Sequence, residues 1–183
     1  MPLGPMVYSK CQIGIMLEEI ARKIQQDLRH CRRRPVFTIV LYGGVPFAPD
    51  LLRLMQHPEN IEVLYIHAAS YGEGTESSGH VKLHYNLPDH LRRDPDNWRL
   101  LHLDEIMDTG GTAHRIIEEF ESLGFLDQRF AVLFDKRVKR RHSVEANYAG
   151  AIVPDRFFVG YGMGLGDRFR MLPDVHTYLP DEP

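Results

Sequence analysis

Apolar runs rich in β-branched residues alternate with segments of helical spacing along this chain. Val36–Leu41 ends at Gly43 and Gly44, and helical character returns over Phe47–Met55. Arg99–Leu103 leads through a polar turn into another helical segment. Strands that alternate with helices predict an α/β fold with a mainly parallel sheet covered on both faces. Because such sheets bind ligands beyond the carboxyl ends of their strands, we expect these turns to converge on one site.

The rest of the chain fits the same architecture. Ile13–Leu28 repeats apolar residues at helical spacing and predicts an amphipathic opening helix. Ser70–Gly79 is rich in glycine and serine and predicts a mobile loop or hairpin. No repeat or linker divides the chain, so we expect one domain over residues 1–183. The other runs expected to form strands are Ile61–Ala68, Phe130–Phe134, Ile152–Val153 and Phe157–Val159.

Composition excludes several classes of partner. The chain has 22 basic and 25 acidic side chains and a net charge of -3. Its overall charge therefore provides no attraction to nucleic acid or anionic lipid. Any bound phosphate therefore needs a local site. Cys11 and Cys31 lack the spacing of a disulfide scaffold or a zinc site, and no apolar run suggests a signal peptide or a membrane span. We expect a cytoplasmic protein.

The segment from Asp104 to Thr112 carries the strongest functional signal. Thr109–Thr112 places two glycines and two hydroxyls at a helix start, where outward-pointing amides bind phosphate. The adjacent Asp104 and Glu105 would repel each other unless they bind a cation or accept hydroxyl protons, and a ribose diol with magnesium provides both. A sugar phosphate satisfies the whole segment. The alternative interpretation is an ordinary acidic helix cap whose carboxylates face water.

The order of residues in this segment resembles the motif by which type I phosphoribosyltransferases bind 5-phosphoribosyl 1-pyrophosphate (PRPP). In that motif a strand leads into paired acids, two further residues and then Asp-Thr-Gly. Further matches from Val36 to about Leu172 are similar to the hypoxanthine-guanine phosphoribosyltransferases. The resemblance implies the type I phosphoribosyltransferase fold, with a small hood and a mobile lid loop. It also implies Mg²⁺-dependent transfer of phosphoribose from PRPP to a 6-oxopurine.

The resemblance assigns roles to residues of this segment. Asp108 matches the catalytic aspartate, which would hydrogen-bond the purine N7 and exchange its proton. Asp104 and Glu105 would hold the ribose hydroxyls and, through them, the magnesium ion. The residues expected to bind the 5′-phosphate are Asp108, Thr109, Gly110, Gly111 and Thr112.

Other segments are similar to the remaining subsites of the family. Leu41–Gly44 looks like the pyrophosphate loop, where a non-proline cis peptide is usual. Lys136 matches the lysine that donates to the 6-oxo group, and an ammonium there favours oxopurines over adenine. The residues expected to bind pyrophosphate are Tyr42, Gly43 and Arg170. The purine would stack on Phe157 and meet the backbone of Phe158. The lid would begin at Ser70 and Tyr71.

Three positions depart from the family's pattern. The acid pair reads Asp104-Glu105 where the family more often has Glu-Asp or Asp-Asp. Tyr42 stands where a lysine or arginine is usual, which predicts weaker pyrophosphate binding. Gly164 stands where an aspartate helps to recognise the 2-amino group of guanine. Hypoxanthine is therefore the expected substrate, with guanine less favoured unless Asp167 takes the missing acid's place.

Two other functions stay open at this point. One is a non-catalytic regulator that binds PRPP or a nucleotide, which the intact Asp108 argues against, and the other is a transferase for xanthine. The resemblance implies PRPP, hypoxanthine, IMP and pyrophosphate as ligands and a homodimer or homotetramer as the assembly. The basic residues after Lys136, Arg137–Arg141, are interpreted as a solvated surface.

Overall fold

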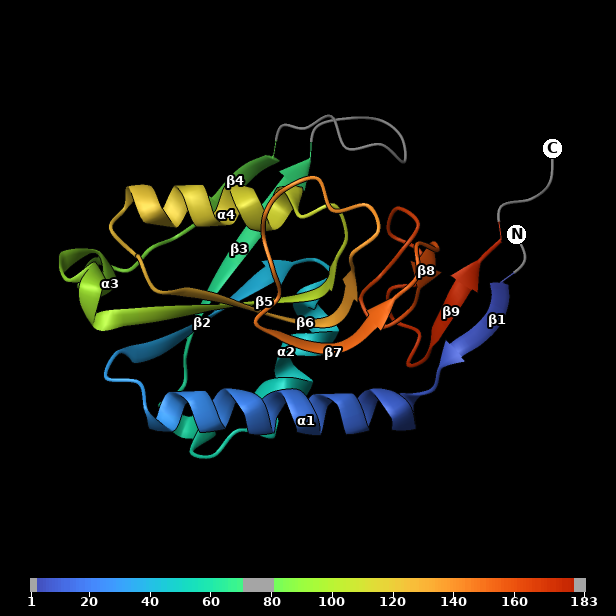
Figure 1. Ribbon diagram of the computed structural model, residues 1–183, viewed down its shortest axis with the longest axis horizontal. Helices are drawn as coiled ribbons and strands as arrows, with labels where there is room; N and C mark the ends of the chain where they lie inside the picture. The colour runs from blue at the N-terminus through green and yellow to red at the C-terminus, as the bar shows by residue number, and fades with distance from the viewer. Residues whose placement is uncertain (1–2, 71–80, 180–183) are drawn as a thin grey trace.

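A six-stranded sheet forms the centre of the protein. The computed structural model describes residues 3–70 and 81–179, and its strands follow the order β4-β3-β2-β5-β6-β7 (Figure 1). Every neighbouring pair is parallel except β3 and β4, which are antiparallel. The predicted mainly parallel sheet is confirmed. The strands are β2 (Arg34–Leu41), β3 (Glu62–Ser70), β4 (Val81–Tyr85), β5 (Trp98–Met107), β6 (Gln128–Lys136) and β7 (Tyr148–Val153).

Helices cover both faces of this sheet (Figure 1). Helices α1 (Lys10–Arg29) and α2 (Gly44–Arg53) pack on one face, where Ile20 and Leu51 belong to one buried apolar cluster. Helix α4 (Gly111–Ser122) packs on the other face, and its Phe120 belongs to a second cluster. The connections also contain the short helix α3 (Asp89–Arg93) and the 3-10 turns Pro58–Asn60 and Pro95–Asn97.

Helix α1 begins three residues before the predicted start because its N-terminus is capped. The Ser9 hydroxyl accepts a hydrogen bond from the Gln12 amide at 3.4 Å, and the Gln12 side chain accepts one from the Ser9 amide at 2.9 Å. This reciprocal capping box satisfies two amides that a helix leaves unpaired. The predicted apolar stripe is confirmed, since Ile13 and Ile24 are buried.

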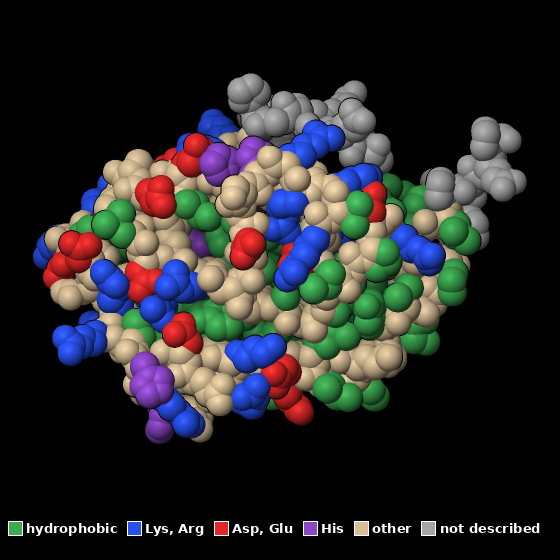
Figure 2. Space-filling view, in the orientation of Figure 1, with side chains coloured by type: hydrophobic (Ala, Val, Ile, Leu, Met, Phe, Trp, Pro, Cys, Tyr) green, Lys and Arg blue, Asp and Glu red, His purple; other side chains and the backbone are tan. Residues whose placement is uncertain are grey.

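A second, three-stranded sheet forms the predicted hood. Its order is β1 (Leu3–Tyr8), β9 (Val175–Tyr178) and β8 (Phe158–Val159), and both pairs are antiparallel. Figure 1 shows this sheet beyond the carboxyl ends of β6 and β7, and Figure 2 shows hydrophobic side chains gathered toward the same side of the molecule. The hood therefore stands over the edge of the large sheet where a ligand is expected.

The lid prediction falls largely outside the described residues. Ser70 is the last residue of β3, and Tyr71 is not among the residues that the structure describes. Within residues 3–70 and 81–179, none of the helices combines the length and the apolar composition that a membrane span requires.

Candidate functional site

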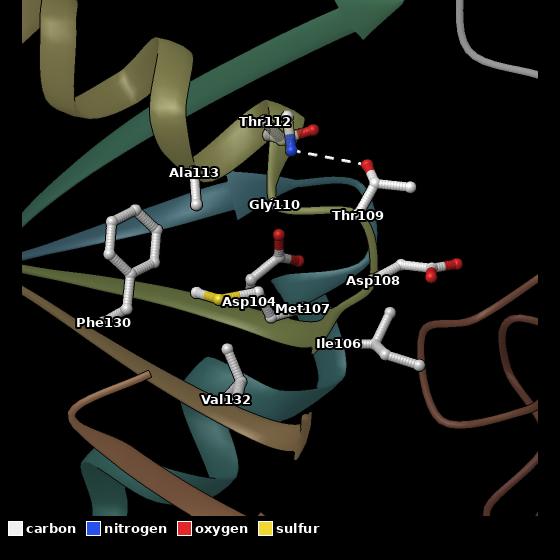
Figure 3. A pocket seen from close by; sticks show the side chains of 11 residues that line it. Asp104, Ile106, Met107, Asp108, Thr109, Gly110, Thr112, Ala113, Phe130 and Val132 are labelled. Carbon is white, nitrogen blue, oxygen red and sulfur yellow. Dashed lines mark hydrogen bonds between the residues drawn. The ribbon is translucent and has the colours of Figure 1, made fainter. Parts of the chain in front are cut away.

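The turn between β5 and α4 forms the centre of the site. Strand β5 ends at Met107 and α4 begins at Gly111, so Asp108 and Thr109 lie in the turn. Gly110 has a φ of 84°, in the left-handed region that glycine adopts without strain. The Thr109 hydroxyl accepts a hydrogen bond from the Gly111 amide at 3.4 Å (Figure 3). The turn and the first amides of α4 thus line a pocket at a helix N-terminus, which suits an anion.

Asp104 and Glu105 lie on opposite faces of β5. The apolar pattern predicted that this strand ends at Leu103, but the strand continues to Met107. Successive side chains of a strand point to opposite faces of the sheet. Asp104 therefore points into the pocket beside the α4 N-terminus (Figure 3), whereas Glu105 lines a second pocket that also contains Lys136. Burial, and after it the charge of Glu105, raises the pKa of Asp104 well above its usual range.

Glu105 packs directly against the turn that follows β2. A Cβ atom on Gly43 would overlap both carboxylate oxygens of Glu105, so a larger residue there would displace this carboxylate. Glu105 is 8% exposed, and its Oε2 atom has no hydrogen-bond partner within the described residues. The peptide bond between Leu41 and Tyr42 is cis, as the resemblance implied. The turn therefore packs directly behind an acid that lines the second pocket.

Tyr42 presents an aromatic ring where the family carries a cation. Its side chain is exposed, and its ring centroid lies 5.1 Å from that of His67 on β3. His67 in turn stacks on His84 of the neighbouring strand β4, with the two ring centroids 6.0 Å apart. Aromatic and imidazole rings therefore cluster beside this turn.

Lys136 connects the two pockets. It is the last residue of β6 and is 6% exposed, and its ammonium donates to the Asp108 carboxylate at 3.1 Å. The same ammonium lies 5.8 Å from the centre of the Phe158 ring. The other carboxylate oxygen of Asp108 is buried and has no hydrogen-bond partner in the described part of the chain. Asp108 thus faces the first pocket and the second.

The hood and the segment after β8 complete the second pocket. Phe157 is 40% exposed, whereas Phe158 is buried at the start of β8, so Phe157 is the ring that a ligand can reach. Arg170 also lines this pocket and donates to the carbonyls of Gly162 at 2.7 Å and Gly166 at 3.2 Å. A Cβ atom on Gly162 would overlap the carbonyl oxygen of Gly43, so this segment packs on the turn after β2.

The segment around Gly164 leaves no room for the acid that is usual in the family. A Cβ atom at this glycine would lie 2.6 Å from the Arg168 carbonyl oxygen and 2.7 Å from Cγ of Arg170. Asp167 is exposed and does not belong to the described residues that line the pocket. The structure therefore does not place Asp167 where it would replace the missing carboxylate.

Comparison with known proteins agrees with this geometry. Residues 10–164 match the phosphoribosyl transferase domain. The hypoxanthine-guanine phosphoribosyltransferase of Streptococcus mutans is 30% identical over 175 residues, which cover 96% of this chain and 93% of the relative. The chain belongs to the hypoxanthine-guanine phosphoribosyltransferase family. The predicted resemblance and the predicted type I phosphoribosyltransferase fold are both confirmed.

Other relatives are similar at comparable identity but over different shares of their length. The enzyme of Staphylococcus epidermidis is 31% identical over 176 residues, covering 96% of this chain and 93% of the relative. The bifunctional TilS/HprT protein of Listeria innocua is 32% identical over 167 residues, and this chain spans only 25% of its length. The structure of the hypoxanthine phosphoribosyl transferase of Trypanosoma cruzi has a TM-score of 0.85 at 27% identity, covering 98% of this chain and 94% of that one.

One residue of this phosphoribosyltransferase was misinterpreted from the sequence. Arg140 was assigned to a solvated basic run, but only 16% of its side chain is exposed. Its guanidinium donates to the carbonyl oxygens of Asp108 at 3.2 Å and Lys136 at 3.1 Å. The basic run Arg137–Arg141 offers no apolar periodicity that would mark one of its members as enclosed. The position of Arg140, four residues after Lys136, is the feature of the sequence that could have indicated its enclosure near the site.

Proposed function

We propose that this protein transfers the phosphoribosyl group of PRPP to hypoxanthine, forming IMP and releasing pyrophosphate. The ion pair between Asp108 and Lys136 carries the proposal, because it joins a helix N-terminus suited to phosphate with a pocket suited to a planar base. Membership in the family supports the same reaction. The other steps follow from the residues of the two pockets.

The 5′-phosphate would bind at the N-terminus of α4. The turn Asp108–Gly110 and the amides of Gly111 and Thr112 line this pocket, and charge-assisted hydrogen bonds of this kind contribute about 1.5–3 kcal/mol each. This binding energy lies away from the reacting carbon. It would hold the ribose so that C1 faces the second pocket, which raises the rate by orienting the reactants.

Asp104 would approach the ribose hydroxyls from the first pocket and Glu105 from the second, one from each face of β5. Carboxylate oxygens are the ligands that Mg²⁺ prefers, and the buried Oε2 atom of Glu105 lacks a hydrogen-bond partner within the described residues, so Glu105 fits a hydrated cation or a ribose hydroxyl. No group of three or more histidine, cysteine or acidic side chains with metal-site geometry occurs in residues 3–70 and 81–179. The ion would therefore be held partly by oxygens of PRPP, where it neutralises charge on the leaving pyrophosphate.

The purine would lie between Lys136, Asp108 and Phe157. The Lys136 ammonium would donate to the 6-oxo group, and the Asp108 carboxylate would accept the hydrogen of N7 and exchange that proton during transfer. Phe157 has the exposure needed for its ring to stack on the base. The backbone of Phe158 would meet the edge of the ring.

The leaving pyrophosphate would be held by the turn after β2 and by Arg170. Gly43 brings the backbone of this turn against Glu105, and Arg170 lines the pocket that contains Glu105. Tyr42 contributes no positive charge, so we expect weaker pyrophosphate binding than a lysine would provide.

The geometry at Gly164 supports a preference for hypoxanthine over guanine. Neither Gly164 nor the exposed Asp167 offers the pocket a carboxylate for the 2-amino group of guanine. The test is nucleotide formation from PRPP with Mg²⁺ and each of hypoxanthine, guanine, xanthine and adenine. We expect the highest kcat/KM with hypoxanthine and none with adenine. Binding of PRPP without turnover of any purine would favour the regulatory function, and a maximum with xanthine would change the substrate.

We also propose that the protein acts in the cytoplasm as a homodimer or homotetramer. Val63 and Tyr65 leave apolar surface exposed on β3, at 37% and 57%. Exposed apolar side chains of this kind are found at contacts between subunits. Light scattering coupled to gel filtration would measure the mass, and a monomer at micromolar concentration would contradict the assembly.

A further inference from the structure

The segment between β6 and β7 holds an arginine whose role the reaction described above does not include. Arg140 lies in this segment, behind the turn that carries Asp108, and Figure 2 shows Lys and Arg side chains gathered over the middle of this face. Its Nε atom donates to the Asp108 carbonyl at 3.2 Å, and an Nη2 hydrogen reaches the Lys136 carbonyl at 3.1 Å. One guanidinium therefore contacts the backbone of both members of the Asp108–Lys136 pair.

Further contacts fix the orientation of this guanidinium. Nη1 donates to the Met107 sulfur at 3.0 Å and to the Val144 carbonyl, and Nη2 donates to the carboxylate of Asp135. Asp135 is 2% exposed, so this ion pair is shielded from solvent. A planar guanidinium with five N–H groups can meet several acceptors at once, which an ammonium cannot do in the same geometry.

The segment around Arg140 also supports the phosphate turn. A Cβ atom on Gly110 would lie 2.9 Å from Cδ of Arg140, so the stem of the arginine packs against this glycine. The backbone amide of the next residue, Arg141, donates to the Thr109 carbonyl at 2.9 Å. The turn is thus held from behind by both the side chain and the backbone of this segment.

We infer that Arg140 is a positioning residue that fixes Asp108 relative to Lys136 and so couples the phosphate pocket to the base pocket. The inference rests on the proposed function for the identity of the two ligands. Arg140 acts through the carbonyl groups of the two residues and through Asp135. Its loss would leave the phosphate turn and the purine-binding lysine free to move independently, and small displacements of this kind lower rates strongly.

The test compares Arg140→Gln and Arg140→Lys with Arg141→Gln. The side chain of Arg141 is exposed, and its backbone bond to Thr109 is kept in the control. We expect Arg140→Gln to raise the KM for PRPP and lower kcat, with kcat/KM reduced roughly 10- to 100-fold. Arg140→Lys keeps the charge but not the fork of donors, and we expect it to restore only part of this loss. The control should stay within about twofold of wild type.

The KM values separate positioning from simple destabilisation, because KM does not depend on the fraction of folded enzyme. Wild-type KM values in both Arg140 variants, with kcat reduced only as far as the folded fraction falls, would overturn the inference. Full recovery in Arg140→Lys would also overturn it, since charge alone would then suffice. If the wild-type protein shows no turnover, the proposed function fails instead. The affinity for ribose 5-phosphate, measured by calorimetry, would then test Arg140: an unchanged Kd in Arg140→Gln overturns its role, and a roughly tenfold weaker Kd supports it.

Discussion

The Lys136 ammonium donates a hydrogen bond to the Asp108 carboxylate across 3.1 Å and thereby connects the end of β6 with the turn after β5. The lysine side chain is 8% exposed and that of the aspartate 45%, so the pair stands at the boundary between protein interior and ligand pocket. A purine that enters this pocket meets a donor and an acceptor whose relative positions are already set. In the proposed reaction, we expect selectivity for the 6-position of the base to follow from this arrangement.

Replacing Lys136 with methionine tests that selectivity. The variant keeps the length of the side chain but removes the donor to the 6-oxo group, so we expect kcat/KM for hypoxanthine to fall roughly 10- to 100-fold, as the loss of one charge-assisted hydrogen bond predicts. Lys139→Met is the matched control, because that lysine pairs with Asp155 and its side chain is 58% exposed. An unchanged kcat/KM in Lys136→Met would show that this residue does not contact the base.

Replacing Tyr42 with lysine restores the cation that is usual at this turn. Tyr42 is 60% exposed, so the new ammonium would remain hydrated, and exposed ion pairs contribute up to about 1 kcal/mol. We expect the Kd for pyrophosphate, measured by calorimetry, to fall roughly two- to fivefold. Tyr42→Phe removes the hydroxyl without adding charge and should leave the Kd unchanged. Equal affinities in the lysine and phenylalanine variants would mean that the side chain at this position does not face the leaving group.

Much of the fold follows from patterns that are local in the sequence. The predicted strand Val36–Leu41 and the predicted helix Ile13–Leu28 both occur, extended by a few residues at their ends. Gly124 follows the end of α4 with a φ of 92°, as expected of a glycine at that position. These elements could be predicted because the period of their apolar residues and the glycine at the helix end are sufficient signals.

The hood strands β1 and β9 could not be predicted, because their sequences lack a clear strand pattern. Strand β1 contains Gly4 and Pro5, which are unfavourable in strands, and it pairs with β9, more than 160 residues away. Pairing over such a distance depends on the rest of the fold. The extension of β5 through Asp104 and Glu105 was missed for a related reason, since acidic residues favour turns unless neighbouring strands enclose them.

The environment of Asp104 predicts that its carboxylate lowers the stability of the fold while it serves the reaction. Burial and the charge of Glu105 raise the pKa of Asp104, so its charged form costs stability, and this cost grows as the pH rises from about 3.9 through the raised value. We expect Asp104→Asn to raise Tm at pH 8 by roughly 2–4 °C, the shift that about 1 kcal/mol produces in a chain of this size, and to lower activity.

The difference in Tm between Asp104→Asn and wild type should be smaller at pH 4 than at pH 8. Asparagine can still accept the hydrogen bond that the Glu105 amide donates at 3.0 Å, so the packing is preserved. Thermal unfolding followed by circular dichroism at both pH values is the measurement. A variant less stable than wild type at pH 8 would show that the carboxylate is not a buried, unfavourable charge.

The buried His102 predicts a loss of stability in acid. Burial lowers its pKa from 6.5 to about 4, and its ring contacts the Thr38 hydroxyl and, at 2.9 Å, the Gln128 side chain. As the pH falls from about 6.5 to about 4, the unfolded chain binds a proton that the folded chain does not, which lowers the free energy of unfolding by up to about 3 kcal/mol.

Urea unfolding of His102→Gln at pH 7 and pH 4.5 isolates this contribution. We expect the free energy of unfolding to fall less between these pH values in the variant than in wild type. His84→Gln is the control, because the side chain of His84 is exposed, and its pH dependence should match that of wild type. Identical pH dependence in His102→Gln and wild type would show that His102 takes up a proton in the folded state.

Turnover of hypoxanthine by wild type and by Asp108→Asn tests the account most directly. Asparagine keeps the size of the side chain but cannot accept the N7 proton, and loss of such an acid–base group lowers kcat by roughly 10²- to 10⁴-fold. We predict rapid IMP formation from PRPP and hypoxanthine by wild type, a decrease of this size in the variant, and IMP binding in the variant within about tenfold of wild type. An inactive wild type, or a variant with the same kcat, would contradict the proposed reaction and the role of Asp108 in it.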